Sequence, residues 1–271
     1  MNLNYTTFLT DVLTKASLVA HNNFGKVVGE IKENNPNQIL TETDLEIGKL
    51  IIEAIKTNYP RHNIIDEEAG VINLGSQYTF VVDPIDGTSN FAKGVAAYGI
   101  MIGLLDGGMP IAAGISLPEF SQIYTAEKDH GAFCNGQPIH VSSEQSLINS
   151  LVAYGIDGHK ENPQKTQKEC LLLSEIVLNI RNLRASNSVL DFALVACGQY
   201  EAYLNQSSKI WDNVAAQLII EEAGGVYTDF FGQKIDYSNP LQRAAQNFTY
   251  CAASPVIHQQ LQDIIRRNFK I

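Results

Sequence analysis

The pair Asp83 and Asp86 stands out in residues 80–91, which read FVVDPIDGTSNF. The apolar residues that open this stretch predict a buried strand. Pro84 cannot donate a ladder hydrogen bond and is expected to end the strand, and Gly87 permits a tight turn. Two carboxylates that converge from such a turn repel each other unless a proton or a cation lies between them. Oxygen ligands of this kind suit Mg²⁺, which also binds substrate phosphate oxygens. An ordinary Asp-Gly turn would explain the stretch if it stood alone.

Further carboxylates fall where strands are expected to end or helices to begin. Asp44 lies in the first turn of a helix that we expect to begin with a capping box of Thr43 and Glu46. Glu67 follows a short apolar strand, and Asp212 is expected to be the N-cap of a helix. Each position has a structural explanation of its own. Because functional groups collect at such positions in layered folds, the set together predicts one acidic site.

The spacing of apolar residues predicts the elements that position these groups. We expect an N-terminal α+β part with an antiparallel sheet over residues 1–141, and a C-terminal α/β part over residues 142–271, closely packed as one unit. Expected helices cover residues 5–21, 44–55, 168–178, 189–197, 212–223 and 255–267. Expected strands cover residues 27–32, 64–66, 80–82, 98–105, 109–117, 122–126, 151–154, 180–183, 201–204 and 248–253, with a turn at residues 34–37, a hairpin at residues 131–136 and a polar surface loop at residues 157–165.

Composition excludes several classes of function. The 271 residues include 19 basic and 29 acidic side chains, a formal charge of −10, which argues against a nucleic-acid-binding surface. An acidic protein still binds a small phosphate when metal ions supply the positive charge. No apolar run approaches the roughly 18 residues of a membrane span, and the N-terminus does not resemble a signal peptide, so we expect a cytoplasmic protein. Its cysteines are widely spaced, which favours reduced thiols over disulfides or a zinc site.

One rival interpretation of the first motif can be tested on spacing. Phosphatases of the haloacid-dehalogenase type carry Asp-x-Asp-Gly-Thr after a strand, with the first aspartate as nucleophile. Here Asp83 and Asp86 are separated by two residues. A shift of one residue turns a side chain to the other face of an extended segment, so the roles of nucleophile and acid would not map.

The sequence resembles the inositol monophosphatase family. Residues 83–91 resemble the first signature of that family, and residues 211–216, running on to residues 222–225, resemble the second. Further family segments follow in the right order, so the resemblance covers nearly the whole chain; they are residues 41–44, 66–69 and 131–136. The resemblance implies a layered αβαβα sandwich like that of fructose-1,6-bisphosphatase. It also implies an Mg²⁺-dependent phosphomonoesterase that hydrolyses a small polyol or sugar phosphate with a metal-activated water.

The resemblance also implies the roles of the acidic residues. Two or three Mg²⁺ ions would be held by the side chains of Glu67, Asp83, Asp86 and Asp212 and the backbone carbonyl of Ile85. Glu67 is chosen over Glu68 because it matches the first glutamate of the family's pair. Glu67 would thereby take part in catalysis as well.

The remaining implied roles concern the water and the phosphate. Thr88, paired with Asp44, would orient the attacking water and help to deprotonate it. The backbone amides of Gly87 and Thr88 would open a helix and cradle the phosphate, as helix N-termini do in general.

The substrate is where this chain departs from the family. Many members have Gly-Ser or Gly-Thr where this chain has Asn187 and Ser188, and a family glutamate that contacts sugar hydroxyls corresponds here to Asn205. An amide also donates hydrogen bonds, which changes the hydroxyls that can be bound. With Asp212, these residues are the candidates for contact with the substrate. Phosphatase chemistry is therefore better supported than specificity for inositol.

A second hypothesis from another class is a scaffold or regulatory protein that retains the phosphatase fold. The intact acidic set argues against it, because clustered carboxylates without a cation are costly to keep. The resemblance further implies inhibition by Li⁺ and a homodimer.

Overall fold

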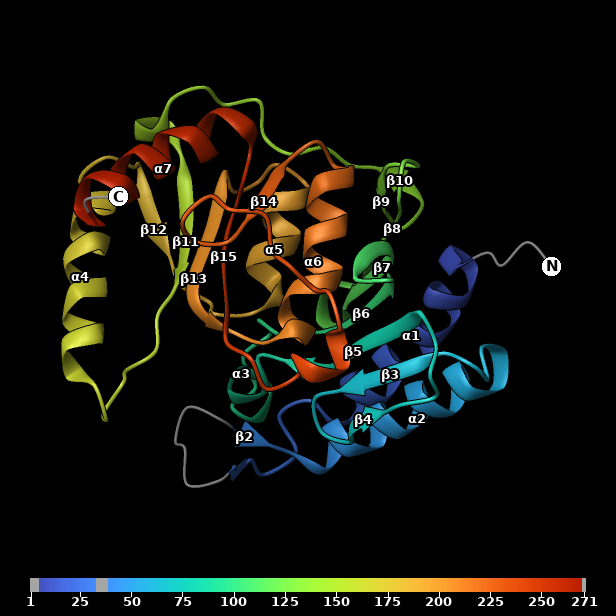
Figure 1. Cartoon of the computed structure of the whole chain (residues 1–271). Helices are drawn as coiled ribbons and strands as arrows, with labels where there is room; N and C mark the ends of the chain where they lie inside the picture. The colour runs from blue at the N-terminus through green and yellow to red at the C-terminus, as the bar shows by residue number, and fades with distance from the viewer. Residues whose placement is uncertain (1–4, 33–38, 270–271) are drawn as a thin grey trace.

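The computed structural model describes residues 5–32 and 39–269, and these form alternating helix and sheet layers (Figure 1). One helix pair covers the outer face of a large sheet, a second pair lies between the two sheets, and a third covers the outer face of a smaller sheet. This is the αβαβα sandwich that the resemblance implies. The helices are α1 (Tyr5–Asn23), α2 (Glu42–Asn58), α3 (Thr88–Ala92), α4 (Pro163–Val177), α5 (Val189–Ala196), α6 (Ile210–Glu222) and α7 (Pro255–Phe269), with 3₁₀ turns η1 (Pro118–Phe120), η2 (Leu147–Asn149) and η3 (Pro240–Gln242).

The larger sheet has eight strands in the order β10-β9-β8-β7-β6-β5-β3-β4. Strands β5 to β10 form the antiparallel meander and hairpin that turn residues predict, and β3 joins β5 in parallel. The strands are β3 (Asn63–Asp66), β4 (Gly70–Ile72), β5 (Tyr78–Asp86), β6 (Gly99–Asp106), β7 (Met109–Leu117), β8 (Gln122–Glu127), β9 (Ala132–Cys134) and β10 (Gln137–Pro138).

The smaller sheet has five strands in the order β12-β11-β13-β15-β14. Strands β12, β11 and β13 run parallel, so their carboxyl ends meet at one edge, where polar side chains collect in such sheets. The strands are β11 (Leu151–Gly155), β12 (Asn182–Arg184), β13 (Ala202–Ser208), β14 (Val226–Thr228) and β15 (Phe248–Ala253), and a separate pair is formed by β1 (Glu30–Ile31) and β2 (Ile39–Leu40).

Helix α6 lies at the centre of the fold and fixes the distance between the sheets. Most of its side chains are buried, because it packs against the larger sheet on one side and β15 on the other. Val214 lies so close to β6 that a Cβ atom at Gly103 would be 2.5 Å from its methyl carbon. Close packing of this kind holds the first turn of α6, and therefore Asp212, against the strands of the larger sheet.

Several predicted boundaries were wrong. The strand predicted over residues 27–32 is only Glu30–Ile31, and the helix predicted from Lys168 begins at Pro163, inside the predicted surface loop. Strands β4 and β14 were not predicted. The turn predicted at residues 34–37 lies outside the described residues. None of the helices within residues 5–32 and 39–269 combines the length and apolar composition that crossing a bilayer requires.

Candidate active site

The first motif occupies the end of β5 and the turn after it. Pro84 was predicted to end the strand, but β5 continues to Asp86, with a register shift against β6 between Asp83 and Asp86. The irregular pairing accommodates a residue without an N–H. Gly87 follows with a φ of 85°, and a Cβ there would lie 2.8 Å from the carbonyl oxygen of Ala97. Both the backbone conformation and the space therefore require glycine, and helix α3 begins directly after it.

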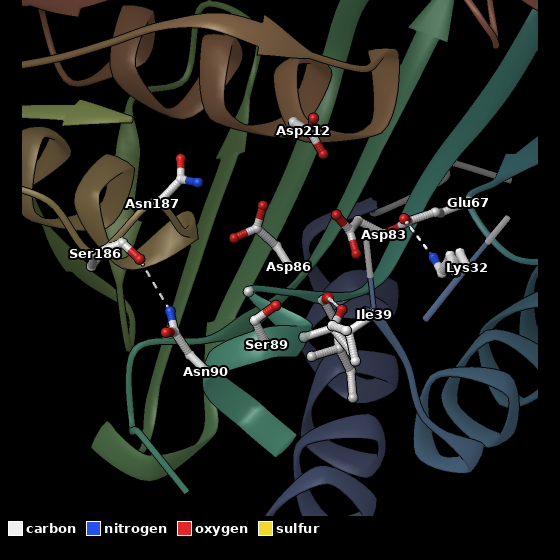
Figure 2. A pocket seen from close by; sticks show the side chains of 13 residues that line it. Lys32, Ile39, Glu67, Asp83, Asp86, Ser89, Asn90, Ser186, Asn187 and Asp212 are labelled. Atoms are coloured by element: carbon white, nitrogen blue, oxygen red, sulfur yellow. Dashed lines mark hydrogen bonds and ion pairs between the residues drawn. The ribbon is translucent and has the colours of Figure 1, made fainter. Parts of the chain in front are cut away.

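Three carboxylates meet at this turn. One oxygen of each of Asp83, Asp86 and Asp212 lies within 4.8 Å of the others, and Figure 2 shows Asp83 and Asp86 reaching toward Asp212 on α6. Asp212 is not the N-cap of α6, as the sequence predicted. Lys209 holds that position, and its backbone N–H donates to Asp212 Oδ2 at 2.6 Å. That bond fixes one oxygen of Asp212, so the other is available to the cluster.

The cluster is electrostatically costly without a cation. Burial raises the pKa of Asp212 to about 7, with the charge of Glu67 adding to the effect. Burial also raises the pKa values of Asp83 and Asp86 well above their usual range, and neighbouring carboxylates raise them further. Asp83 Oδ1 is buried and accepts no hydrogen bond from the described residues. Buried oxygen donors that lack a positive partner are a donor set that fits a hard divalent cation.

Glu67 lies beside the aspartate cluster, but its carboxylate forms an ion pair with Lys32. Because β3 and β5 are parallel neighbours, the residue after β3 lies next to the end of β5, and Glu67 donates its backbone N–H to the carbonyl of Val82 at 3.2 Å. The Glu67 carboxylate is 2.9 Å from the ammonium of Lys32 (Figure 2). The same ammonium also pairs with Glu68. Burial and the charge of Glu67 raise the pKa of Glu68 to about 7. Lys32 therefore occupies the position of a counter-ion for this glutamate pair.

Asp66 holds the turn that carries Glu67. Its buried Oδ1 accepts the backbone N–H groups of Glu68 at 2.9 Å and Ala69 at 2.7 Å. Asp66→Ala would leave both amides unpaired, so we expect a loss of stability of about 1–3 kcal/mol, measured by urea unfolding. Asp66→Asn retains an acceptor and should keep most of this stability; equal effects of Ala and Asn would contradict this role.

Asp44 and Thr88 form the hydrogen-bonded pair that the resemblance implies. Thr88 Oγ1 lies 3.2 Å from Asp44 Oδ1 and 2.8 Å from the carbonyl oxygen of Ile85. The capping box of α2 is not the predicted pair of Thr43 and Glu46. Thr41 is the N-cap, and its backbone N–H donates to Asp44 Oδ2 at 2.9 Å, which leaves Oδ1 facing Thr88. Burial raises the pKa of Asp44 to about 6.

A cavity of about 250 Å³ opens over this arrangement. Its charged lining consists of four carboxylates and one ammonium, and that ammonium, Lys32, is already paired with glutamates. The cavity is lined by Lys32, Ile39, Glu67, Asp83, Ile85, Asp86, Gly87, Thr88, Ser89, Asn90, Ser186, Asn187 and Asp212. A phosphate dianion would be repelled by this lining unless metal ions supplied positive charge.

The predicted substrate-contact residues lie at different depths. Asn187 lines the cavity and has a φ of 52°, a left-handed conformation that asparagine tolerates. Ser188 is the buried N-cap residue of α5 and lies outside the cavity lining, and Asn205 is buried on β13 behind Asn187. Asn205 Nδ2 donates to Asn187 Oδ1 at 3.2 Å. Asn205 thus reaches the cavity through Asn187.

Other residues of the cavity were not predicted. Lys32 is the last residue of the predicted strand 27–32, where nothing marked it as a site residue, and its ammonium reaches the cavity through its ion pairs with Glu67 and Glu68. Asn90 donates to the carbonyls of Ala97 and Ser186 at 2.8 and 3.1 Å and so ties α3 to the segment before α5 (Figure 2). The only sequence feature that pointed to Asn90 was its position inside the first signature.

Comparisons with known proteins agree with this arrangement. The model of the inositol monophosphatase family matches residues 1–267. An inositol monophosphatase of Mesembryanthemum crystallinum is 34% identical over 216 residues, which cover 75% of this chain and 80% of the relative. A fructose-1,6-bisphosphatase/inositol-1-monophosphatase of Aquifex aeolicus is 31% identical over 78% of this chain and 80% of its own. The crystal structure of extragenic suppressor protein suhB from Bartonella henselae superposes with a TM-score of 0.87 and 25% identity, covering 97% of this chain and 98% of the other.

The family match spans almost the entire chain, and the structural similarity extends over the same length. The fold, the order of the motifs and the acidic cavity at their meeting point are consistent with it. The chain therefore belongs to the inositol monophosphatase family and is a phosphatase, a hydrolase of phosphoric monoesters.

Proposed function

We propose that the protein is an Mg²⁺-dependent phosphomonoesterase that acts on the phosphate of a small polyol or sugar. The observation that carries this proposal is the meeting of Asp83, Asp86 and Asp212 in the floor of a cavity that has no unpaired cation among its described lining residues. Such a site excludes a phosphate unless it also takes up divalent metal. The relatives named for inositol monophosphate and for fructose 1,6-bisphosphate support a hydroxyl-rich alcohol as the leaving group.

The residues that would hold the metal are the three clustered aspartates, with the carbonyl of Ile85 and, on release from Lys32, the carboxylate of Glu67. Two or three Mg²⁺ ions fit the number of donors in this set. When held by these residues, Mg²⁺ would supply positive charge for the phosphate oxygens and the leaving alkoxide and would acidify a water, so that no covalent phosphoenzyme would be required.

The proton of the attacking water would leave through Thr88 and Asp44. Thr88 Oγ1 lies within hydrogen-bond distance of both Asp44 Oδ1 and the Ile85 carbonyl, so its one proton would turn to Asp44 while its lone pairs accept a hydrogen bond from a water in the cavity. Asp44, with a pKa of about 6, is ionised for the most part at neutral pH and accepts a proton at Oδ1 more readily than an ordinary aspartate. The pair would therefore orient the water and take up its proton.

The backbone amides of Gly87 and Thr88 would bind the phosphate at the start of α3. Asn187, Asn205 and Ser188 would lie on the side of the leaving alcohol, together with Asp212. We also propose that residues 1–141 and 142–271 act as closely packed parts of one unit, with the cavity between them. The homodimer, the Li⁺ sensitivity and the cytoplasmic location stay predictions.

A panel of phosphate esters tests the proposed substrate class. Myo-inositol 1-phosphate, glycerol 2-phosphate, fructose 1-phosphate, adenosine 5′-monophosphate and phosphoserine are offered with Mg²⁺, and release of inorganic phosphate is measured. The highest kcat/KM is expected with a polyol or sugar phosphate. A preference for the nucleotide or the phosphoamino acid would contradict the proposed class.

A further inference from the structure

The start of α5 holds one oxygen of Asp86. The backbone N–H of Val189, the first residue of this helix, donates to Asp86 Oδ1. An amide at this position has no acceptor inside its own helix, so it is free to bind a side chain. Asp212 is held in the same way by the Lys209 N–H at the start of α6. In each aspartate one oxygen is fixed by a backbone amide, and the other is available to the cluster.

The packing of the fold places the Val189 amide beside Asp86. Gly99 is the register partner of Asp86 on β6, and a Cβ there would lie 2.7 Å from Cγ1 of Val189. The side chain of Val189 is fully buried and fills the space that the glycine leaves. In the turn after β5, a Cβ at Gly87 would lie 3.0 Å from Cβ of Ser188. The start of α5 therefore lies directly against the end of β5 and the strand beside it.

Asn90 joins the same two segments by hydrogen bonds. Its Nδ2 donates to the carbonyl of Ser186 at 3.1 Å (Figure 2) and to the carbonyl of Ala97 at 2.8 Å. These bonds use both N–H groups of the amide, so the side chain cannot turn without losing one of them. The segment before α5 is also held from the helix itself, because Asp191 Oδ2 accepts the Asn187 N–H at 3.1 Å. Asn90 thus ties an already ordered segment to the first motif.

The side chain of Asn90 is not needed for the local structure of its own turn. The turn after α3 is closed by the backbone carbonyl of Asn90, which accepts the N–H groups of Lys93 at 3.1 Å and Val95 at 2.9 Å. Both bonds would persist in a variant that changes only the side chain. A substitution at Asn90 therefore acts chiefly on the contact with Ser186, 96 positions away.

We infer that the backbone N–H of Val189 and the side chain of Asn90 position Asp86 for metal binding, the first by holding a carboxylate oxygen and the second by keeping the start of α5 against the turn after β5. This inference rests on the proposed function and deepens its account of the metal site. If the start of α5 moved away, Asp86 would lose a charge-assisted hydrogen bond and its carboxylate would be free to rotate. The loss should fall on kcat and on Mg²⁺ binding more than on KM for the ester.

Val189→Pro tests the first half, because proline removes the N–H and is favoured at the first position of a helix. Ser188 before it has an extended backbone, with φ −156° and ψ 171°, as proline requires of the preceding residue. Val189→Ala is the matched control, since it keeps the N–H and removes buried side-chain atoms. We expect kcat per folded protein to be about 10- to 100-fold lower in Val189→Pro than in Val189→Ala, with KM values within threefold of each other.

The melting temperature gives a second readout that does not depend on turnover. The rise in melting temperature from EDTA to Mg²⁺ should be smaller in Val189→Pro than in Val189→Ala, because a free Asp86 carboxylate binds metal more weakly. A kcat in Val189→Pro within threefold of that in Val189→Ala, or an equal Mg²⁺-induced rise in the two variants, would overturn the inference.

Asn90→Ala tests the second half, and it decides the question if Val189→Pro does not fold. We expect kcat to fall about three- to tenfold and the Mg²⁺-induced rise in melting temperature to shrink. Asn90→Asp keeps the shape but sets acceptors against two carbonyls, so its kcat should fall further. Asn58→Ala is the control, because exposed Asn58 donates Nδ2 to the Ala54 carbonyl at 2.9 Å outside the cavity lining. Wild-type values of both quantities in Asn90→Ala would overturn the role of Asn90.

The double variant of Val189→Pro with Asn90→Ala tests whether the two groups act through one contact. Its kcat is expected within threefold of that of Val189→Pro alone, because the contact with Asp86 is already lost. Effects that multiplied would overturn the role assigned to Asn90. Absence of Mg²⁺-dependent phosphate release from every ester in the wild type would instead overturn the proposed function, whereas the melting temperatures would still report how Asp86 is positioned.

Discussion

Asp83→Asn is expected to remove nearly all phosphatase activity and, at the same time, to stabilise the metal-free protein. Activity should fall by about 10²–10⁴-fold, since the amide is a weak ligand at a position that preorganises charge for the transition state. Stability should rise by about 1–3 kcal/mol, because the substitution removes the buried member of three carboxylates whose oxygens lie within 4.8 Å of each other. An ordinary core substitution would lower both quantities.

Thermal unfolding in EDTA and in Mg²⁺, together with phosphate release, measures both effects. Mg²⁺ should raise the melting temperature of the wild type and raise that of Asp83→Asn much less, because ligand binding to the folded state stabilises it. Asp11→Asn, at an exposed position of α1, is the control and should leave all three quantities unchanged. A melting temperature in EDTA that is lower in Asp83→Asn than in the wild type would contradict the account of the cluster.

The second large effect is an unusual dependence of stability on pH. In the unfolded chain an aspartate titrates near pH 4, whereas in the folded metal-free protein the pKa of Asp212 is about 7 and those of Asp83 and Asp86 are also raised. Between about pH 4 and pH 7 the folded state therefore holds protons that the unfolded chain has released. Stability in EDTA must then fall as the pH rises through this window, by about 2–4 kcal/mol.

The buried histidine His258 acts in the opposite direction. Burial lowers its pKa to about 4, so its contribution to stability grows as the pH rises toward its unfolded value near 6.5. Asp212→Asn separates the contribution of the aspartate cluster to the pH dependence from that of His258. It keeps an acceptor for the Lys209 amide and leaves His258 in place.

Urea unfolding at pH 5 and pH 7.5 measures the dependence. The loss of stability in EDTA between these values should be smaller in Asp212→Asn than in the wild type. Saturating Mg²⁺ should reduce or reverse the loss in the wild type, because metal binding requires deprotonated ligands. The same pH dependence in both proteins would show that the cluster does not cause it.

Local sequence patterns placed the acidic residues at strand ends and helix starts, but they did not give the exact register of the helices that carry them. Both Thr41 with Asp44 and Thr43 with Glu46 satisfy the spacing of a capping box, and burial of Asp44 beside Thr88 decides between them. Asp212 likewise has the residue type that is preferred at an N-cap, yet α6 begins earlier because Ile210 is buried in the core. In both cases packing between the layers determines where the helix begins, and this packing cannot be deduced from the sequence of one segment.

Residues that reach the site from distant segments had no local signal. Lys32 meets Glu67 across 35 positions, and Asp157 meets Asn187 across 30. Neither contact follows from periodicity or from a motif, because each depends on which strands become neighbours. The parallel pairing of β3 with β5, which places Glu67 beside the first motif, also lies outside the antiparallel sheet that the sequence predicted.

The most direct test of the central claim is an Mg²⁺ titration of phosphate release by protein that has first been stripped of metal with EDTA. Myo-inositol 1-phosphate or the best ester of the panel serves as the substrate, with Asp83→Asn measured in parallel. We expect no turnover without metal, saturable recovery on addition of Mg²⁺ to the wild type, and little recovery in Asp83→Asn. Full turnover in excess EDTA, or equal recovery in both proteins, would contradict a phosphatase built on this aspartate cluster.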